Sequence, residues 1–123
     1  MFDRAGIVEE LLKLEYQGRA HLESGASSFY QLGNAYYNKE SFSEAFGRFK
    51  EAGELTSEKP VKHKAFHNMG NVFMKNKEYA KAVEAYKEAL RNDPSDEETR
   101  YNLALAKELL KKDKENQDKN ENK

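Results

Sequence analysis

The sequence predicts an all-α protein made of helical hairpins. From Phe66 to Leu90, apolar residues recur three and four positions apart in two blocks, so each block places them on one face of a helix. The polar stretch 75–78 between the blocks is short, which suits a tight connection between antiparallel helices. The same pattern starts 37 residues earlier, at Phe29. The hairpin is therefore repeated along the chain.

Length, charge and cysteine content exclude several classes of function. The chain has 123 residues, the size of one domain, and a net charge of -1 with acids and bases interspersed. This balance gives no electrostatic reason to bind nucleic acid or an anionic membrane, so we expect neither as a partner. The sequence has no cysteine, which rules out a disulfide and a thiolate zinc site.

The hydropathy pattern indicates neither a membrane span nor a signal peptide. No run of 18 apolar residues occurs in the sequence. Residues 1–6 lack the basic start and the apolar stretch of a secretory signal. We therefore expect a cytoplasmic protein, or a periplasmic or envelope-associated one if a leader has been removed.

Small residues mark the contact between the two helices of each hairpin. They are Gly33 and Ala45 in the first copy and Gly70 and Ala82 in the second. Small side chains at these places let the helix backbones approach closely, while aromatic side chains fill the gaps beside them. Pro94 follows the second hairpin and ends it.

This pattern resembles the tetratricopeptide repeat, which has an aromatic residue, then Leu-Gly, an aromatic, Ala, an aromatic and Pro at fixed spacings. In this chain the pattern is filled, in order, by Phe66, Met69, Gly70, Phe73, Ala82, Tyr86 and Pro94. The resemblance implies a short α-solenoid of two such repeats, at 26–62 and 63–96. It also implies a role in protein binding.

The two copies are 37 residues apart, whereas the family period is 34. Every position up to Ala52 stays in phase with the second copy, so the three extra residues follow it. We expect an extended connection in the segment 53–62, built as either a longer second helix or a longer loop.

Single helices are expected on both sides of the repeats. The segment 3–24 has an apolar stripe, formed by Ile7, Val8, Leu11 and Leu12. A stretch of Ser, Gly and Ala at 24–28 then breaks this helical pattern. Residues 97–111 predict a capping helix with one apolar face. Residues 112–123 contain no apolar side chain and are expected to be disordered.

No group of residues in the sequence indicates catalysis. His63 and His67 are four positions apart and could share a helix face, but no third ligand is placed to complete a metal site. Each glycine stands alone, so there is no glycine-rich phosphate loop. We therefore predict a non-catalytic protein that needs no cofactor and no metal.

The remaining candidate for function is a surface. In stacked hairpins of this family the first helices line a concave face. By the family pattern, the lining residues are Tyr30, Asn34, Tyr37, Asn38, Lys64, His67, Asn71, Lys75, Tyr101 and Leu105. Asparagine side chains can pair with the backbone of an extended peptide, and tyrosine offers a large contact area at low entropy cost.

We predict an adaptor that binds a peptide or protein segment in this groove. The alternative is a structural module that assembles into a homodimer through the helix at 3–24. The family also includes modules that hold a partner's C-terminal carboxylate with Lys and Arg beside Asn. Tyr30 and His67 stand where such a module would have Lys, and Glu98 would oppose an anion, so we do not expect that activity.

The second half of the chain shows a narrower resemblance. The runs 66–71, 91–96 and 101–107 and the Lys-, Asn-, Asp- and Gln-rich tail look like those of bacterial aerotolerance-associated (Bat) tetratricopeptide proteins. The resemblance covers about residues 60–123 well and implies a scaffold of the bacterial cell envelope.

Overall fold

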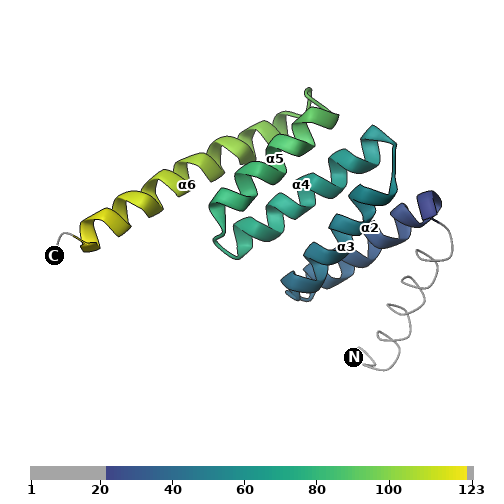
Figure 1. The fold of residues 1–123 in the computed structure, drawn as a ribbon, viewed down its shortest axis with the longest axis horizontal. Helices are drawn as coiled ribbons and strands as arrows, with labels where there is room; N and C mark the ends of the chain where they lie inside the picture. Colours follow the sequence, from purple (N-terminus) through teal and green to yellow (C-terminus); the bar gives the residue numbers. More distant parts are fainter. Residues whose placement is uncertain (1–21, 122–123) are drawn as a thin grey trace.

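The computed structural model describes residues 22–121, which form five α-helices and no strand. The helices are α2 (Leu22–Asn38), α3 (Phe42–Leu55), α4 (Lys59–Lys75), α5 (Tyr79–Asn92) and α6 (Glu97–Glu121). Each helix packs against the next, and α2 to α5 lie side by side as two antiparallel hairpins (Figure 1). The predicted all-α solenoid is confirmed. The helix predicted at 3–24 lies outside the described residues, apart from its last three positions.

The two hairpins are built alike. Helices α2 and α4 are each described over 17 residues, and α3 and α5 each have 14. Both hairpin turns place a non-glycine residue in the left-handed region, Glu40 at φ 61° and Lys77 at φ 59°. In each turn the next backbone N–H reaches back five residues, from Ser41 to the Tyr36 carbonyl and from Glu78 to the Phe73 carbonyl. This is a Schellman motif, which satisfies the last carbonyls of the first helix.

The connection between the hairpins is shorter than expected. Helix α3 ends at Leu55 and α4 begins at Lys59, so only residues 56–58 lie between them. The extra residues form an added first turn of α4, and the prediction of a longer second helix or loop is wrong. Pro60 fits this turn because a first-turn N–H has no intrahelical partner to lose. The Thr56 hydroxyl oxygen closes the short loop by accepting the Glu58 N–H at 3.0 Å.

The segment 24–28 is helical, although its sequence predicted a break. It lies within α2, which runs without interruption to Asn38. Ala26 and Phe29 are each 1% exposed, and Phe29 packs with Leu32, Ala52 and Ala65. Because tertiary packing supplies most of the stability of a helix in a protein, this burial outweighs the low helix propensity of Ser and Gly.

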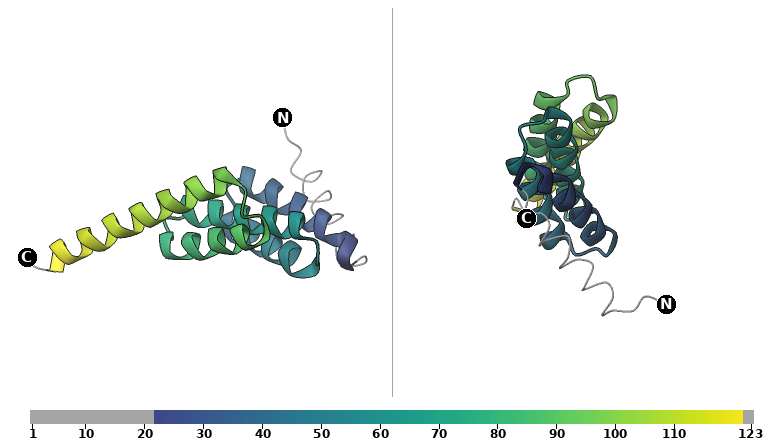
Figure 2. Two further views of the ribbon diagram at one scale, coloured as in Figure 1. Left: turned by 90° about the horizontal axis from the view of Figure 1, so that it is seen from above. Right: turned by 90° about the vertical axis from the view of Figure 1, so that its right-hand side faces the viewer.

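Helix α6 also extends farther than predicted. It includes residues 112–121, which were expected to be disordered, and every side chain in 111–120 is exposed. The helix therefore rests on local preferences. Lys, Glu and Gln are good helix formers, and Glu108–Lys112 and Glu115–Lys119 have the favourable i, i+4 order. Figure 1 shows this end of α6 projecting beyond α4 and α5, and Figure 2 shows it from two further sides.

The core is built from aromatic rings set against glycine. The Phe49 ring lies so close to Gly33 that an added Cβ would come within 2.6 Å of it, and the Tyr86 ring occupies the same place over Gly70. Ala45 and Ala82 are 0% exposed and pack in the same clusters as these rings. Close approach of the two helices in each hairpin thus depends on the absence of a side chain at one position.

This packing predicts opposite effects of one substitution at two glycines. Gly70→Ala should cost roughly 1–3 kcal/mol of unfolding free energy, because the Tyr86 ring must move. Gly47→Ala is the control, since nothing lies within 4 Å of its Cβ position and Ala favours the helix by about 1 kcal/mol. Urea unfolding of both variants measures the difference. Equal stabilities would contradict the role assigned to Gly70.

The exposed end of α6 predicts that the tail can be removed without loss of stability. Deletion of residues 112–123 should lower the helical circular-dichroism signal and leave the melting temperature nearly unchanged, because every side chain in 112–120 is exposed. A large fall in melting temperature would show that the tail packs on the rest of the protein.

Candidate functional site

Two adjoining cavities lie along α2, α4 and α6. The first has a volume of about 220 Å³ and is lined by Asn34, Tyr37, Asn38, Phe49, Asn68 and Asn71. The second, of about 290 Å³, is lined by Tyr37, Asn71, Met74, Lys75, Tyr86 and Asn102. Tyr37 and Asn71 line both cavities, so the cavities adjoin. We refer to the two together as the amide groove.

The amide groove contains five of the ten residues predicted to line a binding face: Asn34, Tyr37, Asn38, Asn71 and Lys75. Tyr30 contacts the groove through a hydrogen bond to Asn68. The predicted residues Lys64, His67, Tyr101 and Leu105 do not line either cavity.

Sequence reasoning missed Asn68 and Asn102. They lie 34 residues apart, one family period, and Gln31 stands 37 residues before Asn68. A side-chain amide at the same repeat position in all three first helices was the available signal. Met74, Tyr86 and Phe49 were assigned to the core or not considered, yet each also faces a cavity.

Asn68 connects the first helices of the two hairpins. Its Nδ2 donates to the Tyr30 hydroxyl at 3.1 Å and to Asn34 Oδ1 at 3.3 Å. Both acceptors lie on α2, whereas Asn68 lies on α4. Beneath this network the Tyr30 ring packs on Phe49 with ring centroids 5.9 Å apart. The network fixes how the two helices face each other across the first cavity.

Tyr86 orients the amide of Asn71. Its hydroxyl donates to Asn71 Oδ1 at 2.6 Å, and its ring is 1% exposed. Burial, with smaller contributions from Tyr37 and Glu98, raises the pKa of Tyr86 well above its ordinary value of 10. The hydroxyl therefore stays neutral and keeps donating across the physiological pH range.

The amide groove carries little charge. Among the described residues that line it, Lys75 is the only charged one. Its polar groups are otherwise amides and tyrosine hydroxyls, which are neutral donors and acceptors. The groove is thus suited to uncharged polar groups, with one cation at the C-terminal end of α4.

A larger cavity of about 480 Å³ lies between α3, α4 and α5 and has a mainly apolar lining. The rings of Phe46 and Phe73 meet there with centroids 5.1 Å apart. Its charged residues Lys81, Glu84 and Glu88 form ion pairs with neighbours on α5 or just before it. Unlike the amide groove, this cavity has no polar group held in place by a hydrogen bond between helices.

The turn into α6 is built by two aspartates. Asp93 Oδ1 accepts the Ser95 N–H at 3.1 Å and the Ser95 hydroxyl at 2.6 Å, and these bonds lower the pKa of Asp93. Pro94, predicted to end the repeat, lies exposed in this turn. Asp96 Oδ1 accepts the Glu98 N–H at 3.0 Å and so caps the first turn of α6.

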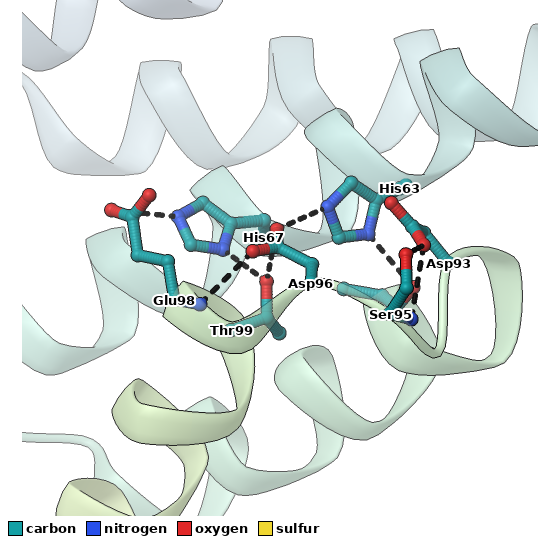
Figure 3. Close-up of polar contacts among 8 residues, drawn as sticks. His63, His67, Asp93, Ser95, Asp96, Glu98 and Thr99 are labelled. Carbon is teal, nitrogen blue, oxygen red and sulfur yellow. Dashed lines mark hydrogen bonds and ion pairs between the residues drawn. The ribbon is translucent and has the colours of Figure 1, made fainter.

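A chain of hydrogen bonds joins this turn to α4 (Figure 3). His63 Nδ1 lies 2.9 Å from the Ala89 carbonyl oxygen, which can only accept, and His63 Nε2 lies 2.6 Å from Asp96 Oδ2. The Thr99 hydroxyl also donates to Asp96 Oδ2, at 2.9 Å. Its oxygen is then left to accept from His67 Nδ1 at 2.7 Å.

Two groups in this chain of hydrogen bonds, Asp96 and His67, have shifted pKa values. Burial alone would raise the pKa of Asp96, but hydrogen bonds from Thr99, from the His63 ring and from backbone N–H groups lower it below the usual 3.8. Burial lowers the pKa of His67 below 6.5, helped by nearby His63 and opposed by Glu98 and Asp96. His67 is therefore neutral near pH 7.

The hydrogen-bonded chain is a structural joint between α4 and α6. Thr99 is 0% exposed, so its hydroxyl is out of reach of a substrate. Within residues 22–121 no group of three or more His, Cys, Asp or Glu side chains could hold a metal ion. His63 and His67, whose spacing alone was not expected to form a metal site, bond to Asp96 and Thr99 respectively.

Residues 63–96 match the family model of the tetratricopeptide repeat. The matched segment is the second hairpin. It comprises α4 from His63, α5 and the turn to Asp96. A search of curated proteins gave no match to the chain. Tetratricopeptide repeats generally mediate protein–protein interactions and are typically non-catalytic. No helix within the described residues has the length and apolar character needed to cross a membrane.

The lowered pKa of His67 predicts a loss of stability on acidification. Below pH 6.5 the unfolded chain binds a proton at this residue more readily than the folded one, so unfolding free energy should fall as pH drops through 6.5 toward the folded pKa. His67→Asn removes the titration and can keep an N–H bond to Thr99. Thermal unfolding between pH 8 and pH 5 tests the difference between the two proteins.

The groups facing His67 are present in both proteins. They are Glu98 and Asp96 from the start of α6, and His63 and the Tyr86 ring. Their own titration therefore cancels to first order in the comparison. The variant should lose less stability than the original protein over this range, and parallel curves would contradict the effect of burial on His67.

Proposed function

We propose that this protein is a non-catalytic adaptor that binds an extended peptide or protein segment in the amide groove. The observation that supports this most directly is that the two cavities adjoin and are lined in turn by residues of α2, α4 and α6. Successive first helices contribute Asn34, then Asn68 and Asn71, then Asn102 to the lining of the groove. An extended segment has amide groups at regular intervals that could pair with such a row.

Exposed apolar side chains near the groove support the same function. Tyr101 is 69% exposed and Leu105 is 39% exposed, and they are the large hydrophobic residues of the described chain that stand out to solvent. They are four positions apart on α6, so they share one face of the helix. Asn102, which lines the second cavity, lies between them in sequence. A bound segment could bury this apolar surface where it leaves the groove.

Two finer predictions remain proposals. The likeness of residues 60–123 to bacterial Bat proteins would make the partner a component of the cell envelope. Self-assembly through the helix at 3–24 would make it a second copy of the chain, and most of that segment lies outside the described residues. The amide groove is independent of both, since it is formed entirely by described residues.

Selection from a library of random peptides tests the function without knowledge of the partner. Asn38 is exposed at the edge of the first cavity, so Asn38→Arg should obstruct the groove without disturbing the core. Ser43→Arg on α3 is the matched control, because it is also exposed and changes the charge equally. Selected peptides should bind the original protein and the control alike and the groove variant about tenfold more weakly, which corresponds to loss of one good contact.

Binding can be measured by fluorescence anisotropy with labelled peptides. Peptides that bind Asn38→Arg as tightly as the original protein would locate the binding surface elsewhere. Failure to select any peptide above background would contradict the adaptor function.

A further inference from the structure

In the first cavity, protein contacts determine which way three asparagine amides are turned. Asn68 uses both Nδ2 hydrogens, one for the Tyr30 hydroxyl and one for Asn34 Oδ1. Asn71 uses its Oδ1 to accept from Tyr86. Rotation of any of these amides would break a bond between helices, so each side chain offers a defined atom to the cavity.

Each of the three amides has one further polar atom that bonds to no described residue, and these atoms are two donors and one acceptor. They are Nδ2 of Asn34, Oδ1 of Asn68 and Nδ2 of Asn71, and none has a hydrogen-bond partner among residues 22–121. All three side chains line the same cavity of about 220 Å³. That volume corresponds to about seven water molecules, which is room for one polar side chain.

We propose that this cavity binds the side-chain carboxamide of a glutamine or asparagine carried by the peptide in the groove. The proposal rests on the function proposed above and specifies which peptides the groove prefers. The carboxamide oxygen accepts from the N–H groups of Asn34 and Asn71, and the carboxamide NH₂ donates to Asn68 Oδ1. The methylene part of the side chain packs against Tyr37 and Phe49, which line the same cavity.

Other side chains fit this pattern less well. A carboxylate has no proton for Asn68 Oδ1, and no cation lines the first cavity to favour its charge. A lysine ammonium would face the donors of Asn34 and Asn71 without an acceptor for most of its protons. Methionine has a similar length to glutamine but would leave all three asparagine atoms without a partner on the peptide, so it gains none of these hydrogen bonds.

Three capped pentapeptides test the proposal: Ala-Ala-Gln-Ala-Ala and its versions with Glu or Met at the centre. Each is titrated into the isotope-labelled protein while the side-chain NH₂ signals of Asn34, Asn68 and Asn71 are followed by nuclear magnetic resonance. The Gln peptide should shift the Asn34 and Asn71 signals and bind about tenfold or more tightly than the Glu or Met peptide, since only it pairs all three atoms.

Two variants separate the role of the amides from general effects on the groove. Asn71→Asp keeps an oxygen to accept from the Tyr86 hydroxyl, replaces the N–H group offered to the cavity with a second oxygen and adds a negative charge. It should abolish the preference for Gln over Met, a comparison that the added negative charge does not bias because neither side chain is charged. Asn102→Asp introduces the same charge in the second cavity and should leave the preference unchanged.

The results of these titrations distinguish the carboxamide proposal from the proposed adaptor function. If all three peptides shift the same asparagine signals with equal affinity, the groove binds peptides but the carboxamide proposal is wrong. If no peptide shifts any groove signal at millimolar concentration, while library selection also fails, both proposals are wrong. If free glutamine binds as tightly as the Gln peptide, the cavity is a small-molecule site and the peptide-borne carboxamide is excluded.

Discussion

The contact between an aromatic ring and a glycine is the interaction on which the rest of the structure depends. In each hairpin the ring belongs to the second helix and the glycine to the first, as with Tyr86 over Gly70. The contact holds the two helices at a short distance and places the far edge of the ring on the groove side. For Tyr86 that edge carries the hydroxyl that orients Asn71. One side chain thus links the packing of the repeat to the chemistry of its surface.

The hairpins could be predicted from the sequence because their signals are local and regular. Apolar spacing, the glycine and alanine positions and the 37-residue recurrence all agree with the structure. The boundaries were harder to predict, because a residue type has different meanings in different places. Pro60 lies in the segment 53–62, where a longer second helix or loop was expected, but it is compatible with the first turn of α4. The Ser- and Gly-rich segment 24–28 suggested a break but is held in α2 by the burial of Ala26 and Phe29.

Only half of the residues predicted from the sequence to line the binding face do so, and the reason is a different one. The repeat pattern identifies which residues project from the first helices, and five of its ten positions line the amide groove. It does not identify residues whose importance comes from a neighbouring repeat, such as Asn68, which bonds to Tyr30 and Asn34 across the interface of α2 and α4. The direction in which each amide points depends on those partners and cannot be read from one helix alone.

The joint between α4 and α6 has a geometric consequence. Helix α6 has 25 residues and is anchored by its first turn and by the apolar side chains that face α5, while its last part has no packing partner in the described chain. At 1.5 Å per residue it is about 37 Å long, so a rotation of about 10° at the anchored end would move the other end by about 6 Å. The direction of a long charged helix is therefore set near one end, by its packing on α5 and by the hydrogen bonds that join His63 and Thr99 to Asp96 and His67 to Thr99.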